Sequence, residues 1–426
     1  MMGMKQDNYT QKFFTLNEDV VLVEGVNGGL IQDLNNRKIF SVDRDSKVYL
    51  SKLISGEEVN SVLDEMSLQD KDRFQIYLKL LISKNLGNYS NSYCKTSQCE
   101  KNIKTQVETL WLELRRSCNM NCCHCYLDSK GSADASLNLL KLEEWKSVLK
   151  QINKKYLKRI ILIGGEPLLF KDISVLISFI REEFIAIELV IYSNLTLLND
   201  ELIDVFRKNN VKIVTSLYSN KSYVHDKITG QVGSFEKTVK AIERLVLENI
   251  YVKANMVVMN DNYYDIDATK EFIFKITGNI PKIDLIRNVG EDKGYLLPPT
   301  KCISNKRMKA NFKGISKNEY IKNISGNSCW QGKMNITCDG YISPCIMGEA
   351  FINKNYNVRK ISIDKIIEEY LIVDFWSVSK DKIEVCKECE YRYVCNDCRP
   401  ICVDKNNFYA KDKNCNYNPK KRLFIE

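Results

Sequence analysis

Apolar and polar positions along the chain predict three regions with different spacing. In the first, residues 1–100, short strand patterns cover 20–24, 28–34 and 38–42, and Gly25, Asn27 and Gly28 predict a hairpin between the first two. Helical spacing follows over 46–54, 57–66 and 70–86. Three short strands followed by three helices predict a small winged-helix-like domain.

The second region, residues 101–301, alternates strand patterns with helix patterns. The apolar strand segments are 111–114, 160–163, 188–192, 212–217, 251–258 and 282–286. Helical stripes lie between them, for example Ile173, Leu176, Ile177 and Ile180. This alternation predicts an α/β fold with a parallel sheet covered by helices, and six units suit a partial (β/α)6 barrel.

Polar residues follow the carboxyl ends of these strands. Residues 118–125 (CNMNCCHC) follow the first strand, residues 164–167 (GGEP) the second, and Ser193 and Asn194 the third. Ser216 ends the fourth strand. Parallel α/β folds form their sites at this edge, so the four segments predict one site. Its glycines allow close backbone approach, and Glu166 can meet an ammonium group.

The third region, residues 302–426, has little regular periodicity and is rich in cysteine. Cys329 is followed by Gly340 and, after four more residues, by Cys345. A second group follows: Cys386, Cys389, Cys395, Cys398, Cys402 and Cys415. Such clustering predicts metal binding, since clustered cysteines in a reducing cytosol are more often ligands than disulfides.

Charge and hydropathy narrow the functional classes. The net charge is +9, but no basic stripe is interleaved with aromatic residues, so we expect no nucleic-acid partner. Residues 1–10 are polar and lack the apolar part of a signal peptide. No uncharged apolar stretch reaches 18 residues, so we expect no membrane span and a cytoplasmic location.

Cys118, Cys122 and Cys125 are candidate ligands of an iron–sulfur cluster. Three thiolates on one loop can hold three irons of a cubic four-iron cluster and leave the fourth iron open. That iron can chelate a molecule that has an amine and a carboxylate. The alternatives are a zinc loop and a disulfide cluster, but zinc sites commonly use paired C-x-x-C units. Cys123 fits better as a small packed side chain than as a ligand.

The loop and the GGEP motif resemble the radical S-adenosylmethionine (AdoMet) enzymes. The resemblance implies that the open iron binds AdoMet and that one electron cleaves it to a 5′-deoxyadenosyl radical. His124 fills the aromatic position before the last loop cysteine. The resemblance further implies AdoMet contacts from Gly164, Gly165 and Glu166 to the methionyl amine, and from Ser193 and Asn194 to the ribose or carboxylate.

The third region resembles the SPASM extension, which carries two auxiliary four-iron clusters. The resemblance places Cys329, Cys345 and Cys398 on the first cluster, and the second cluster on Cys386, Cys389, Cys395 and Cys415. This chain has two residues between Cys395 and Cys398 where the family has three, so Cys398 and Cys402 compete for one role. Cys338 is a candidate fourth ligand of the first cluster, which could instead have an open iron.

The first region resembles the leader-peptide recognition element of enzymes that modify ribosomally made peptides. The whole chain is thus similar to SPASM peptide maturases, which use the radical to install a thioether or carbon–carbon crosslink in a precursor peptide. Expected partners are that peptide and a one-electron reductant such as flavodoxin or ferredoxin. One alternative is a maturase of a protein substrate, such as a sulfatase or a quinone-cofactor precursor. The other is a zinc-binding nucleic-acid or scaffold protein.

Overall fold

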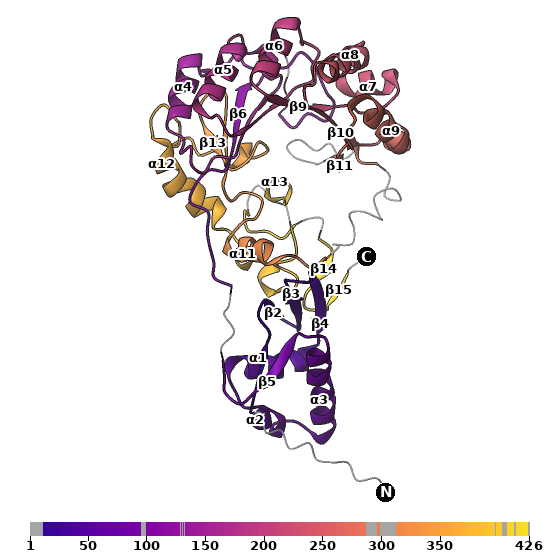
Figure 1. Cartoon of the computed structure of the whole chain (residues 1–426), viewed down its shortest axis with the longest axis vertical. Coiled ribbons are helices and arrows are strands. Elements are labelled where there is room, and N and C mark those ends of the chain that lie inside the picture. The colour runs from indigo at the N-terminus through magenta and orange to yellow at the C-terminus, as the bar shows by residue number, and fades with distance from the viewer. Residues whose placement is uncertain are drawn as a thin grey trace.

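The chain forms three stacked tiers in a computed structural model (Figure 1). The structure describes residues 12–94, 99–127, 129, 131, 133–286, 296–298, 312–396, 398–402, 407–412 and 415–424. A helix-covered sheet forms the upper tier in Figure 1, cysteine-rich segments lie below it, and the amino-terminal elements form the lower tier.

The lower tier contains the predicted hairpin, third strand and three helices. An antiparallel sheet in the order β2-β3-β4 joins β2 (Val20–Gly25), β3 (Gly28–Asp33) and β4 (Lys38–Val42). The helices are α1 (Arg44–Ser55), α2 (Val59–Asp64) and α3 (Leu68–Ser83). The Asp43 side chain caps α1 at its start, and Gly56 ends the helix at φ 106°.

One strand pair of the lower tier was not predicted. β1 (Phe13–Leu16) pairs antiparallel with β5 (Gly87–Ser90). Each strand has four residues, and the partners lie at opposite ends of the module's sequence. Local periodicity carries no information on such a pairing, because only tertiary contact brings the two segments together.

The upper tier is the predicted parallel sheet. Its six strands follow chain order: β6 (Thr109–Arg115), β7 (Arg159–Gly164), β8 (Glu188–Tyr192), β9 (Val211–Ser216), β10 (Val252–Val258) and β11 (Ile283–Leu285). The connecting helices cover its outer face (Figure 1) and include α4 (Leu142–Lys150), α5 (Ile173–Glu183), α6 (Asp200–Lys208), α7 (Ser222–Thr229), α8 (Ser234–Leu247) and α9 (Ile266–Thr277). The partial-barrel prediction is confirmed.

The cysteine-rich region adds two strands to this sheet. β12 (Lys333–Ile336) pairs in parallel with β6, and β13 (Ile342–Ser343) pairs antiparallel with β12. The region also contains α11 (Lys317–Ser325), α12 (Ile363–Ile366) and a π-helical continuation, Ile367–Trp376. It therefore shares one core with the barrel, which its weak periodicity did not indicate.

The hairpin sheet of the lower tier is covered on both faces. One face packs on α1, α2 and α3 through Ile31 and Val42. Val23 and Leu34 belong to a second cluster with Tyr320 and Ile324 of α11 and with Tyr393. All six residues of β3 are accordingly buried, so the lower tier is packed against the cysteine-rich tier.

The sequence predicts no membrane span, and the helices of the structure can be compared with that prediction. Among those in the described ranges, none combines the length and the apolar character that a bilayer crossing requires.

Two leucines of α8 test the packing of the upper tier. Leu245 is fully buried, whereas Leu247 is 81% exposed. Leu245→Ala should lower the free energy of unfolding by about 2–5 kcal/mol, because it leaves a cavity between α8 and the sheet. Leu247→Ala should change it by about 0.5 kcal/mol or less. Urea unfolding of both variants measures the difference; equal midpoints would contradict this packing.

Candidate functional site

The cysteine loop and the GGEP segment meet at the carboxyl edge of β6 and β7. The Gly165 amide donates to the Arg115 carbonyl over 2.8 Å, and the Glu166 amide donates to the Ser117 carbonyl over 3.0 Å. Gly164 has φ 149°, a backbone conformation that favours glycine. Both Gly164 and Gly165 lie close to the backbone of the cysteine loop. A Cβ would lie 2.1 Å from the Arg115 oxygen at Gly164, and 2.3 Å from the Ser117 oxygen at Gly165. No side chain fits at either position.

The Glu166 carboxylate joins β7 to the end of β8. It is fully buried and accepts from the Ser193 hydroxyl at 2.7 Å and the Asn194 amide at 2.8 Å. The Leu168 amide donates to it over 3.0 Å. Burial raises the pKa of Glu166 to about 7, although these donors act in the opposite direction. A carboxylate has about four acceptor positions, so one remains for a further donor.

Asn194 connects the end of β8 to the cysteine loop. Its Nδ2 donates to Asn119 Oδ1 over 2.9 Å and lies 3.8 Å from Cys118 Sγ. The Thr238 hydroxyl donates to its carbonyl over 3.0 Å. The structure therefore brings three predicted segments into contact: the loop, the GGEP motif and the Ser193–Asn194 pair.

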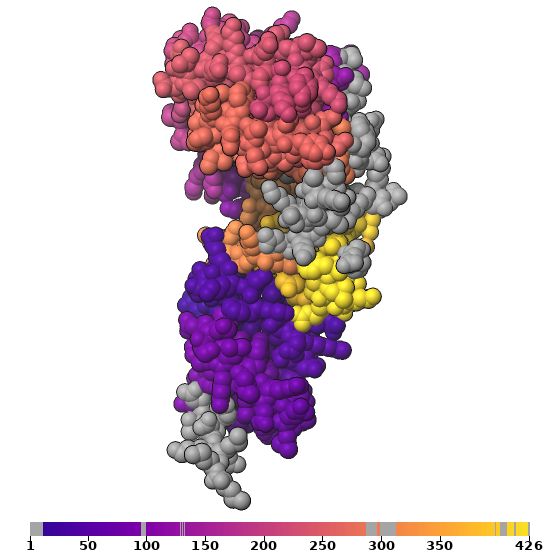
Figure 2. Space-filling view, turned by 90° about the vertical axis from the view of Figure 1, so that its right-hand side faces the viewer, coloured from indigo at the N-terminus to yellow at the C-terminus, as the bar shows by residue number. Residues whose placement is uncertain are grey.

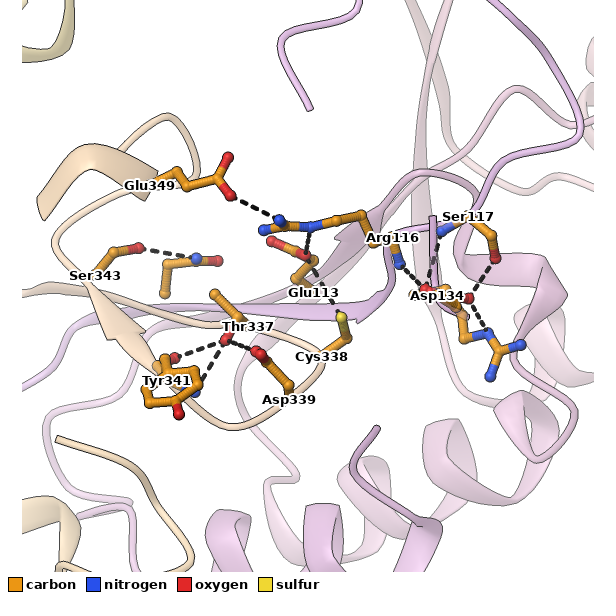
Figure 3. Close-up of polar contacts among 12 residues, drawn as sticks. Glu113, Arg116, Ser117, Asp134, Thr337, Cys338, Asp339, Tyr341, Ser343 and Glu349 are labelled. Carbon is orange, nitrogen blue, oxygen red and sulfur yellow. Dashed lines mark hydrogen bonds and ion pairs between the residues drawn. The ribbon is translucent and has the colours of Figure 1, made fainter. Parts of the chain in front are cut away.

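Asp134 supports the start of the cysteine loop and was not identified from the sequence. It accepts from the amides of Arg116 at 2.8 Å and Ser117 at 3.1 Å, and from the Ser117 hydroxyl (Figure 3). Arg115 Nε forms an ion pair with it at 3.0 Å. Asp134 lies in a stretch without strand or helix periodicity, so no sequence signal indicated this role.

The three loop thiols are half-buried beside one another. Burial raises the pKa of Cys118, and raises that of Cys122 to about 12, with smaller contributions from neighbouring thiols. Cys123 packs against an apolar cluster that includes Tyr218 and Ile228. The His124 ring lies edge-on to the Tyr218 ring, with 4.8 Å between centroids.

In the cysteine-rich tier, one thiol of each predicted auxiliary set lies within electrostatic range of two others of the same set. The charges of Cys329 and Cys398 act on Cys345, and those of Cys386 and Cys395 act on Cys389. Burial is the larger cause and raises the pKa of both Cys345 and Cys389 to about 12. Cys415 is half-buried, and its amide donates to the Asp412 carbonyl. The side chain of Cys402 lies outside the described residues.

Cys338 is held by the barrel (Figure 3). It is buried in the β12–β13 turn, and its thiol lies 3.7 Å from Glu113 Oε1 on β6. Burial raises the pKa of Glu113 to about 7. Arg116 forms ion pairs with Glu113 at 3.3 Å and with Glu349 at 2.7 Å, which join the start of the cysteine loop to the segment after Cys345. None of these partners was predicted.

Tyr126 is a residue on which the charges of two cysteine sets act. Burial raises the pKa of its phenol well above the usual value. The charges of Cys125, from the cysteine loop, and of Cys345, from the first predicted auxiliary set, both add to this shift. The two sets therefore lie within electrostatic reach of the same hydroxyl group.

The donor chemistry fits iron–sulfur clusters. Within the described ranges, no three His, Cys, Asp or Glu side chains converge as the ligands of one metal ion. A four-iron cluster does not require such convergence, because each thiolate binds a different iron. The Cys118, Cys122 and Cys125 thiols lie on one loop, and they must lose their protons when they bind metal.

Comparisons with known proteins agree with this geometry. Residues 112–273 match the radical SAM superfamily. AlbA of Bacillus subtilis (strain 168), an antilisterial bacteriocin subtilosin biosynthesis protein, is 22% identical over 373 residues, which cover 83% of this chain and 81% of AlbA.

Two solved structures share the fold. Streptococcus suis SuiB bound to precursor peptide SuiA has a TM-score of 0.59 and 16% identity, over 95% of this chain and 100% of SuiB. The enzyme anSMEcpe with bound AdoMet has a TM-score of 0.56 and 16% identity, over 74% of this chain and 95% of that protein. Residues 112–273 thus form a radical SAM domain, and the chain shares its fold with SuiB and anSMEcpe.

Proposed function

We propose that the chain binds AdoMet at the carboxyl edge of β6–β8 and modifies a ribosomally made precursor peptide. AdoMet binding is supported by the hydrogen bonds that connect three segments: the cysteine loop, the GGEP motif and the Ser193–Asn194 pair. Cys118 contacts Asn194, and Asn194 and Ser193 donate to Glu166. A cluster on the loop would lie directly beside groups that can bind an amino acid ammonium and carboxylate.

In this proposal Cys118, Cys122 and Cys125 hold the cluster, which supplies the electron for AdoMet cleavage when it is bound. Gly164 and Gly165 pack directly against the backbone of the cysteine loop, so their own backbone lies next to the cluster and would contact the methionyl amine. Glu166 holds Ser193 and Asn194 in place and offers its remaining acceptor position to the same amine. His124 and Tyr218 form an aromatic wall beside the loop.

The two auxiliary clusters belong to the same proposal. The electrostatic grouping of Cys329, Cys345 and Cys398, and of Cys386, Cys389 and Cys395, supports two separate sets. We place Cys415 in the second set by the resemblance to SPASM domains. The buried contact between Cys338 and Glu113 supports the version in which Cys338 is not a cluster ligand, which leaves Cys402 or an open iron for the fourth position of the first cluster.

A peptide substrate is supported by the relatives and by the lower tier. AlbA is described as a bacteriocin biosynthesis protein, and SuiB was solved with a precursor peptide. The similarity to SuiB extends over 95% of this chain, against 74% for anSMEcpe. The proposed product is a crosslinked peptide, with a thioether bond or, alternatively, a carbon–carbon bond. The reductant would be a flavodoxin or ferredoxin.

The open edge of β4 is the proposed leader-binding strand. Among the described residues, β3 is the one strand that pairs with β4. The Leu34 amide donates to the Asp19 carbonyl directly opposite, so even-numbered residues of β3 bond to β2 and odd-numbered ones to β4. Ile31 therefore bonds to Phe40, and the backbone groups of Ile39 and Ser41 point to the free edge.

Helix α3 provides an apolar wall beside this edge. Ile76 is 67% exposed and Leu80 is 47% exposed, and the two lie on one helix face. Lys84, four residues further, has its Nζ 5.9 Å from the centre of the Phe40 ring. The carboxyl end of α3 therefore lies beside β4, and we expect an added strand to pair with the β4 backbone while its side chains meet Leu80 and Ile76.

Iron analysis tests the cofactor content. The protein made without oxygen should contain about twelve irons, which correspond to three four-iron clusters. Replacement of Cys118, Cys122 and Cys125 by Ala should leave about eight irons and abolish cleavage of AdoMet to 5′-deoxyadenosine. A single Cys123→Ala change is the control and should retain both properties. Zinc in place of iron would contradict the assignment.

Glu166→Gln tests the AdoMet site. The Glu166 carboxylate accepts three hydrogen bonds, but a glutamine side chain has an NH2 group in place of one carboxylate oxygen. This group would face a donor instead of accepting from it, so Ser193 and Asn194 should lose their fixed positions. Hydrogen bonds to buried charged groups contribute about 1.5–3 kcal/mol, so the AdoMet Kd should rise by about ten- to a hundredfold. Glu188→Gln, at the opposite end of β8, is the control. Equilibrium binding measures both; an unchanged Kd for Glu166→Gln would count against the site.

Ile39→Pro tests leader binding at β4. Proline removes the one amide that faces the free edge at that position, so the leader Kd should rise about tenfold or more, while AdoMet cleavage without peptide continues. Ile39→Ala removes the side chain and keeps the amide, so its leader Kd should stay closer to that of the parent. Fluorescence anisotropy with a labelled leader measures both. Unchanged affinity in Ile39→Pro would refute binding at this edge.

A further inference from the structure

The β2–β3 turn is bonded directly to the loop that carries Cys386 and Cys389. The Val26 amide donates to the Glu388 carbonyl over 2.8 Å. Arg392 Nη1 donates to the Glu24 carbonyl at 2.6 Å and to the Cys389 carbonyl at 3.0 Å. One guanidinium therefore binds a backbone carbonyl on each side of the contact.

A buried ion pair extends this contact to β4. Glu390 is fully buried beside Cys389, and it accepts from the Tyr417 hydroxyl at 2.6 Å and from Arg422 Nε at 3.2 Å. The other end of the Arg422 guanidinium donates to the Ser41 hydroxyl over 2.5 Å. Burial of a carboxylate is costly without a paired cation, so Arg422 cannot leave Glu390 without a penalty.

The two surfaces also fit closely in shape. A Cβ at Gly25 would lie 2.8 Å from Glu390 Oε2 and 2.9 Å from the Glu390 amide nitrogen. Asn27 Nδ2 donates to the Lys420 carbonyl over 2.9 Å. In Figure 2 the yellow carboxyl-terminal residues lie against the indigo and violet amino-terminal tier. The contact therefore combines charge, backbone hydrogen bonds and close packing.

We propose that Glu390, Arg392 and Arg422 are positioning residues that set which residue of the precursor peptide reacts. They fix the free edge of β4 relative to the cysteine loops, so a leader bound there has a defined distance to the reaction centre. A tethered segment reaches a site efficiently only when its anchor and length match the span. This inference rests on the proposed binding of the leader at β4.

The test uses two variants of the full-length enzyme, Asn27→Ala and Arg422→Lys, singly and combined. Lysine keeps a charge near Glu390 but lacks the fork that reaches Ser41 as well. Asn27→Ala removes the contact with the Lys420 carbonyl and leaves the Glu390–Arg422 pair unchanged. Lys421→Ala is the matched control, because it changes an exposed neighbour of Arg422. Each protein is assayed for iron, leader affinity, 5′-deoxyadenosine and the position of the modification by mass spectrometry.

The combined variant should keep its iron, its leader affinity within about twofold and its 5′-deoxyadenosine formation. The yield of modified peptide per 5′-deoxyadenosine should fall about fivefold or more, since small misplacements reduce reaction rates strongly. Modification should also spread to neighbouring residues of the precursor. Lys421→Ala should match the parent in every measurement.

Three results separate the possible failures. A parent-like yield and position in the combined variant, or in Asn27→Ala if Arg422→Lys loses iron, would overturn the positioning role. Weakened leader binding with an unchanged modification position would also overturn it, because these residues would then bind the leader. Absence of leader binding by the parent enzyme would instead refute the proposed function on which the inference rests.

Discussion

The site depends on the close approach of two backbone segments, the start of the cysteine loop and the GGEP turn. Hydrogen bonds from Gly165 and Glu166 hold the loop carbonyls at a distance that excludes any side chain at either glycine. This contact fixes where the loop leaves β6, so it also fixes the distance from Cys118 to Asn194. The buried Glu166 then extends the same constraint to the next strand.

Much of the fold could be predicted because the spacing of apolar residues and the order of the segments can be read directly from the sequence. Apolar runs identified the six parallel strands, and their order placed the GGEP motif and Ser193 at one edge. The pairing of β1 with β5 and of β12 with β6 could not be predicted, since each joins segments far apart in the sequence. The direction of a backbone amide in an edge strand cannot be predicted from the sequence either. The register between β3 and β4 decides that the amide of Ile39, and not that of Phe40, points to the free edge.

The supporting residues of the site were missed for a related reason. Asp134 lies in a turn and Glu349 begins a short 3-10 helix, and their importance comes from partners on β6 or just after it. A carboxylate in a loop is ordinary until the fold buries it against backbone amides or a guanidinium. Cysteine spacing, by contrast, is visible in the sequence itself, so it predicts the thiol sets but says nothing of their surroundings.

The pairing of β12 with β6 has a consequence for synthesis of the chain on the ribosome. The barrel strands are made in order, but β6 gains its outer neighbour when Lys333–Ile336 has emerged. Until then the first strand of the barrel presents free backbone groups, which can pair with other chains. A nascent or truncated chain that stops before β12 should therefore be prone to aggregation, and its dependence on chaperones should end when this strand is added.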